Sequence, residues 1–139
     1  MRTALLSLFI LCSAGAAQAA DLTLTVIHAA DFGPVRGMVF GDADSFDRRE
    51  SPVAKFSQTS ENGIVVVSLA NLPPGRYAVA LYQDRNGNDR LDKTMFGLPT
   101  EPYGFSNDAS APLGPPDFDQ AAFVIAQTEQ HHAITITLR

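Results

Sequence analysis

One polar stretch, residues 84–92, carries the side chains best able to do chemistry. It reads DRNGNDRLD, so carboxylate and amide oxygens recur at alternating positions along it. Oxygens arranged in this way are what a hard cation such as calcium needs, and a backbone carbonyl commonly completes the set. The stretch therefore predicts a structural calcium site with five ligands, Asp84, Asn86, Asn88, Arg90 and Asp92.

The spacing of this stretch matches an EF-hand loop only in part. The sixth position is Asp89, where an EF-hand needs glycine, and the twelfth is Met95, where it needs a bidentate glutamate. Any site is therefore of a non-helical type. The acidic residues available to complete it from later in the chain are Glu101, Asp108 and Asp117.

Two other interpretations of the stretch stay open. Asn86-Gly87 alone favours a two-residue turn, in which Asn and Asp side chains satisfy the backbone without an ion. Alternatively, Asp84, Asp92 and Glu101 would supply the acid and base of a small hydrolase. Because no nucleophile elbow, phosphate loop or zinc-protease motif accompanies them, a non-enzymatic protein is the leading interpretation.

A transition-metal site is not expected. The three histidines are His28, His131 and His132, and the adjacent pair would point to opposite faces of a strand. The only cysteine, Cys12, lies in the N-terminal apolar run. Once that run is removed, the chain has no thiol for a disulfide or a zinc site.

Residues 1–20 have the pattern of a signal peptide. A positive start is followed by an apolar run over residues 4–14, and Ala17-Gln18-Ala19 has the small residues that signal peptidase reads. We expect export to the periplasm or the cell exterior, with cleavage near Ala19 or Ala20. Residues 21–139 would then form a single domain.

The composition argues against two kinds of partner. Lys and Arg number 10 against 15 Asp and Glu, and the formal net charge is −5. With no basic run to meet a phosphate backbone, nucleic acid is not expected. No apolar stretch after the signal peptide approaches membrane-spanning length, so the mature chain is expected to lack a membrane span.

The remaining sequence has the period of two that is typical of β-strands. Such segments lie at residues 22–26, 35–40, 53–56, 64–69, 76–82, 121–126 and 133–138. About seven short strands without an amphipathic helix predict an all-β fold, an antiparallel β-sandwich. The β-branched run at 64–69 predicts a central strand, and residues 45–51 predict an exposed loop with at most one helical turn.

A long segment, residues 84–120, interrupts this pattern. Compact domains seldom carry a structureless connection longer than about 12–15 residues, and the aromatic residues and prolines here favour one long ordered loop. The segment predicts a partner surface that includes Tyr103, Phe105, Asn107 and Phe118. The alternative is that its aromatic residues form a satellite core beneath the loop.

A series of motifs resembles the bacterial secreted family called domain of unknown function 2141 (DUF2141). The motifs are LPPGRYAV at 72–79, DRNGN at 84–88, LD at 91–92, FGLP at 96–99, Glu101, YGFSN at 103–107 and PPDF at 115–118. The resemblance runs from about Leu24 to Leu138. It implies an exported, Ig-like or transthyretin-like sandwich without an assigned activity. One departure is Gln83, where the resemblance leads us to expect a histidine.

These observations favour a non-enzymatic binding or accessory module of the cell envelope. Its sandwich would be a scaffold, and the surface formed by residues 84–118 would contact an envelope protein or a glycan. The small carboxylate-dependent hydrolase is the alternative.

Overall fold

The structure is a computed structural model that describes residues 18–139. The predicted signal peptide lies mostly outside these residues, and the expected cleavage point falls at their edge. Eight strands and three short helices make up the described chain. They are β1 (Ala20–Ile27), β2 (Val35–Phe40), α1 (Ala43–Arg48), β3 (Ala54–Gln58), β4 (Ile64–Leu72), β5 (Gly75–Gln83), β6 (Tyr103–Phe105), η1 (Ser106–Asp108), α2 (Phe118–Ala121), β7 (Phe123–Ile125) and β8 (His131–Thr137).

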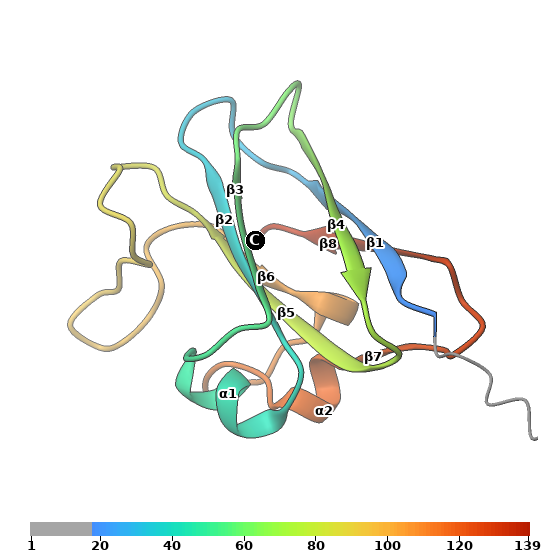
Figure 1. The fold of residues 1–139 in the computed structure, drawn as a ribbon. Coiled ribbons are helices and arrows are strands. Elements are labelled where there is room, and N and C mark those ends of the chain that lie inside the picture. Colours follow the sequence, from blue (N-terminus) through green and yellow to red (C-terminus); the bar gives the residue numbers. More distant parts are fainter. Residues whose placement is uncertain (1–17) are drawn as a thin grey trace, which may run out of the picture.

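The strands form two sheets that pack face to face (Figure 1). The smaller sheet has the order β4-β1-β8, and the larger has the order β3-β2-β5-β6 with β7 also paired to β5. The predicted all-β sandwich is confirmed. One pair departs from the antiparallel pattern, because β1 and β8 run parallel, with Leu24 opposite Ile134.

Alternation along the strands places one face of each sheet in a common core. In β1, Leu22, Leu24 and Val26 are fully buried while the intervening threonines are only partly covered. Val39 of β2 and Val79 of β5 face them from the larger sheet. Burial of this apolar area is the main force that holds the two sheets together.

The segment predicted to be a central strand is an edge strand. β4 lies at the end of the smaller sheet, and its side chains alternate between buried and exposed. Ile64 and Val66 point to solvent with 46% and 59% of their surface exposed. A continuous β-branched run therefore indicates strand propensity here without indicating burial on both faces.

A second apolar cluster covers the other face of the larger sheet. Phe40, Ala78 and Ala80 from the sheet pack against Phe46 of α1 and Phe118 of α2. In Figure 1 these two helices lie together at the lower end of the molecule. The prediction of an exposed loop over residues 45–51 was wrong at Phe46, which is fully buried.

Local caps explain why this helix forms where it does. The Asp42 side chain accepts a hydrogen bond from the backbone N–H of Ser45, which satisfies a free donor of the first turn. Arg49 ends the helix in the left-handed conformation, with φ of 57°. Phe46 is thereby directed at the sheet.

The long segment 84–120 is ordered, but it is not one loop. β6, η1 and the start of α2 divide it into two loops, residues 84–102 and 109–117. The first of these projects to the left of the sandwich in Figure 1. In residues 18–139 no helix is long and apolar enough to cross a membrane.

Candidate binding groove

Asp84 is the organising residue of the loop that follows β5. Its side chain is fully buried, and its two oxygens accept hydrogen bonds from the backbone N–H groups of Gly87, Asn88 and Asp89 at 2.7–3.1 Å. Arg36 Nε donates to the same carboxylate at 2.9 Å. The carboxylate therefore holds the loop in the way that a cap holds a helix terminus.

These contacts set the charge state of Asp84. Burial acts to raise its pKa, but hydrogen bonds from the Asp89 backbone and the Arg36 side chain, with others from the loop, outweigh it. The pKa of Asp84 therefore lies below its ordinary value. The carboxylate is ionised at neutral pH and pairs with a guanidinium of fixed charge.

Three of the other predicted calcium ligands come together on the outside of the loop. Asn88 Nδ2 donates to both oxygens of Asp92 at 2.8–2.9 Å, and Asn86 Nδ2 donates to one of them. Arg90 also turns towards Asp92, with 3.6 Å between Nε and Oδ1. Asp84 does not join this group, because its oxygens face the backbone.

Glu101 closes the loop from the other side. It is 7% exposed, and its two oxygens accept from the backbone N–H groups of Arg85 and Asp92 at 2.8 Å and 3.2 Å. Two largely buried carboxylates thus fasten one loop. These contacts make the loop a wider turn than the expected two-residue one.

Residues 18–139 hold no group of three or more His, Cys, Asp or Glu side chains placed to bind a metal ion. His132 stacks on Phe123 with 5.0 Å between ring centroids, and its Nδ1 lies 2.8 Å from Glu129. The calcium site stays a prediction, to be tested by titration.

Gln83 has a structural position at the end of β5. Its side chain is fully buried, and its amide oxygen accepts from the Ala30 backbone at 2.9 Å. Its amide nitrogen lies 2.7–3.1 Å from the carbonyls of Ala30, Phe32 and Gly33. This residue, where the resemblance suggested histidine, fastens the turn between β1 and β2.

The larger of two adjoining hollows lies on the outer face of the larger sheet, beside the second apolar cluster. Two rows of paired residues form its floor: Met38, Ala80 and Phe105 in one, Tyr82 and Tyr103 in the next. Residues 89–99 form one wall and residues 111–115 the other. We call this hollow the groove; its volume is about 740 Å³.

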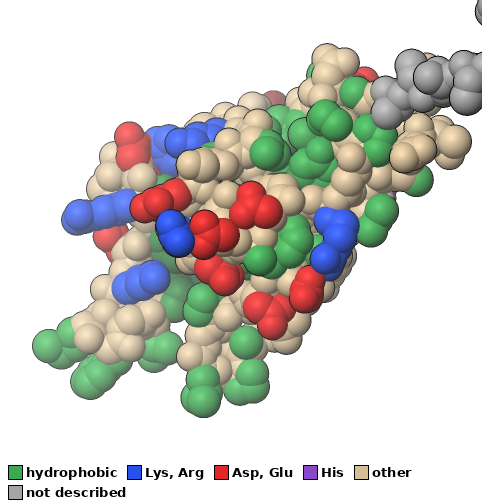
Figure 2. Space-filling model, turned by 60° about the horizontal axis from the view of Figure 1, so that its bottom comes forward, with side chains coloured by type: hydrophobic (Ala, Val, Ile, Leu, Met, Phe, Trp, Pro, Cys, Tyr) green, Lys and Arg blue, Asp and Glu red, His purple; other side chains and the backbone are tan. Residues whose placement is uncertain are grey.

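The walls of the groove expose apolar side chains. Phe96, Leu98 and Leu113 have 85%, 64% and 100% of their surface exposed. Figure 2 shows two projections with apolar tips at the lower left, separated by a hollow. Exposed apolar residues that gather around one cavity are typical of a binding site, whereas scattered ones are not.

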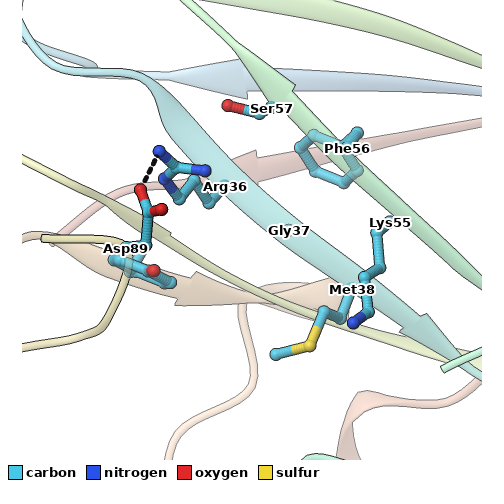
Figure 3. A pocket seen from close by; sticks show the side chains of 8 residues that line it. Arg36, Gly37, Met38, Lys55, Phe56, Ser57 and Asp89 are labelled. Atoms are coloured by element: carbon cyan, nitrogen blue, oxygen red, sulfur yellow. Dashed lines mark hydrogen bonds and ion pairs between the residues drawn. The ribbon is translucent and has the colours of Figure 1, made fainter. Parts of the chain in front are cut away.

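A smaller hollow of about 480 Å³ adjoins the groove and shares Met38, Tyr82 and Asp89 with it. Figure 3 shows Arg36 of β2 turned towards Asp89, with Lys55 and Ser57 on the neighbouring strand. Arg36 bridges the buried Asp84 and the exposed Asp89. The Arg36 guanidinium therefore lies between the buried carboxylate of Asp84 and the exposed carboxylate of Asp89.

The four residues predicted to form a partner surface have different positions. Phe105 and Phe118 are only 8% and 6% exposed and belong to the second apolar cluster, as the satellite-core alternative proposed. Tyr103 is half-buried in the groove floor. Asn107 is exposed, and its amide nitrogen donates to the Ala122 carbonyl at 2.8 Å.

Sequence reasoning missed the residues that give the groove its character. Leu98, Leu113 and Arg49 were not singled out, although all three line it. For Leu98 and Leu113 the available signal was an apolar residue in a loop rich in glycine and proline, outside any predicted strand. Arg49 had no such signal, because its position depends on the burial of Phe46.

Comparison with protein families gives a match over residues 26–133, to the uncharacterised proteins conserved in bacteria known as DUF2141. No curated protein and no solved structure matches the chain. The matched region includes the loop fastened by Asp84 and both walls of the groove. The chain therefore belongs to the DUF2141 family.

Proposed function

We propose that the protein is an exported, non-enzymatic binding module of the cell envelope, and that the groove binds a small molecule with an apolar body. The observation that carries this proposal is the groove itself. Its volume of about 740 Å³ lies within the range of about 300–1,000 Å³ that small-molecule sites occupy.

The chemistry of the lining supports an apolar ligand over a glycan. Most of the side chains in the groove are apolar or aromatic, and five are charged, namely Asp47, Arg49, Asp89, Arg90 and Lys93. A sugar would bring many hydroxyl groups that need partners on burial. An apolar ligand would instead cover Phe96, Leu98 and Leu113, which are now exposed to water.

The hydrolase alternative gains no support from the loop. Asp84, Asp92 and Glu101 accept hydrogen bonds from backbone or amide groups that fix the loop conformation. Export is supported by the pattern of residues 1–20 and can be tested separately by fractionation of cells.

A fluorescence titration tests the proposal. N-phenylnaphthylamine is a neutral probe whose emission rises in apolar surroundings, and we expect the protein to bind it saturably. Phe96→Ser combined with Leu113→Ser should weaken the affinity at least tenfold, about 1.4 kcal/mol, because the ligand loses two apolar contacts. Val66→Ser, at an equally apolar but remote exposed position on β4, should leave the affinity unchanged.

Two results would contradict the proposal. One is an absence of saturable probe binding to the wild-type protein. The other is an affinity that falls equally in the groove variant and the β4 variant, which would indicate general surface adsorption. Equal thermal midpoints of the three proteins would show that the substitutions do not act through folding.

A further inference from the structure

Arg49 stands at one end of the groove in an unusual setting. Its guanidinium carbon lies 4.0 Å from the ring centroid of Phe46 and 5.4 Å from that of Phe105. One nitrogen, Nη1, donates to the Phe46 carbonyl at the end of α1. The side chain is half-buried and forms part of the groove lining.

No carboxylate of the described residues forms an ion pair with Arg49. Burial lowers the pKa of this guanidinium below its ordinary value, and the charge of Asp47 offsets part of that effect. A half-desolvated cation with free donors is the strongest anchor for an anion that a largely apolar site can offer.

The charged side chains that line the groove carry a formal excess of one positive charge, because Arg49, Arg90 and Lys93 outnumber Asp47 and Asp89. Arg36 is shared between Asp89 and the buried Asp84, so it offsets only one of their two negative charges. Arg90 lies near Asp92, and Lys93 in the same wall has no ion pair with the described residues. This balance is opposite in sign to the net charge of −5 of the whole chain.

We propose that the groove selects amphipathic monoanions, with the acid group of the ligand on the Arg49 guanidinium and its apolar body between the walls at Leu98 and Leu113. This inference rests on the proposed function of the groove. It names the ligand class as a small free carboxylate with an aliphatic or aromatic body. Asp47 lines the groove and forms no ion pair with the described residues, so its charge opposes such a ligand.

The test compares decanoate with 1-decanol, which share an apolar chain and differ in the head group. Each is used at neutral pH to displace N-phenylnaphthylamine from the intact protein. We expect decanoate to displace the probe at a concentration about tenfold lower than decanol, as a charge-assisted hydrogen bond would give. Arg49→Met should bring the ratio of the two displacing concentrations close to one, without lowering the affinity for decanol.

Two further variants keep the result interpretable. Arg48→Met removes an exposed arginine of the same helix that already pairs with Asp44, and it should leave the ratio unchanged. Asp47→Asn should raise the affinity for decanoate by about two- to threefold and leave the affinity for decanol unchanged. This second variant keeps the test decisive should Arg49→Met fail to fold.

The possible failures are distinguishable. If neither compound displaces the probe, the proposed groove function is wrong. If both displace it equally in the wild type and in the Asp47→Asn variant, the groove binds apolar ligands and the anion site at Arg49 is wrong. An equal loss of decanoate affinity in the Arg48→Met and Arg49→Met variants would also overturn the anion site, since it would show a nonspecific charge effect.

Discussion

The side-chain oxygen of Ser106 accepts a hydrogen bond from the backbone N–H of Val79 at 2.8 Å, on the side of β5 that faces away from β2. β6 pairs with β5 at residues 80–82 and β7 pairs with it at residues 75–77, so Val79 falls in the gap. The Ser106 hydroxyl then donates to the Ala121 carbonyl at 2.5 Å. One fully buried hydroxyl thus joins the sheet to α2.

Ser106→Ala is expected to destabilise the protein by about 1–3 kcal/mol, because it leaves the Val79 N–H and the Ala121 carbonyl buried without partners. Urea unfolding followed by circular dichroism would measure the loss. Ser57→Ala, at an exposed position on β3, should change stability by less than about 0.5 kcal/mol. A Ser106→Ala protein as stable as wild type would show that water or a local shift replaces the hydroxyl.

Loss of the Asp84 carboxylate should be costly and should depend on pH. Asp84→Asn is expected to cost about 1–3 kcal/mol at neutral pH, since Arg36 and several backbone N–H groups lose a charged acceptor. The pKa of Asp84 is depressed in the folded state, so its stabilisation is present above the unfolded pKa of about 4. That stabilisation is lost as the pH falls below this value.

Unfolding measured from pH 7 down to about pH 3 would check this expectation. The free-energy difference between wild type and Asp84→Asn should shrink on acidification. Asp89→Asn, which alters the exposed partner of Arg36, provides the control and should cost little at any pH. A difference between wild type and Asp84→Asn that stays constant with pH would contradict an ionised, stabilising Asp84.

Much of the sandwich could be predicted from alternation alone. β1, β2 and β5 lie where the period of two placed them, and the tyrosine that follows the Pro-Gly corner bonds back across it. Tyr77 donates from its hydroxyl to the Pro73 carbonyl at 2.7 Å. Such features are local, since each depends on neighbours in the sequence.

The groove could not be predicted in the same way, because it depends on contacts between distant segments. Phe46 and Phe105 are 59 residues apart in sequence, and their ring centroids lie 6.1 Å apart in the fold. The sequence around Arg49 gives no sign that Phe46 and Phe105 meet beside it. The backbone contacts of Asp84 were likewise not predictable, because an acidic loop that binds a cation and one that caps its own backbone have the same residue types.

Calcium should leave the thermal midpoint unchanged. Asp84 is engaged with the backbone, and Asn86 and Asn88 turn amide nitrogens towards Asp92, so the loop has its hydrogen bonds without an ion. We expect equal midpoints in chelator and in calcium up to about 10 mM, above the range in which weak extracellular sites fill. A rise with calcium that Asp92→Asn abolishes would confirm the calcium prediction instead.

Export is expected to leave Ala20 as the first residue of the mature protein. Ala20 begins β1, is fully buried and pairs with Leu72, whereas Ala19 is exposed. Cleavage after Ala19 therefore retains the whole strand. The intact mass of protein recovered from the periplasm or the medium would check this, and a mass that starts at Asp21, or an uncleaved cytoplasmic chain, would contradict it.

The central claim is that the groove is a ligand site, and amide chemical-shift mapping tests it most directly. Decanoate added to isotope-labelled protein should shift resonances of the groove floor and both walls, at Tyr82, Phe96, Leu98, Tyr103 and Leu113. Amides of the core strand β1 and of the exposed face of β4 should stay unchanged. Shifts confined to β4, shifts spread over the whole sandwich, or none at saturating ligand would contradict the assignment of the groove as the binding site.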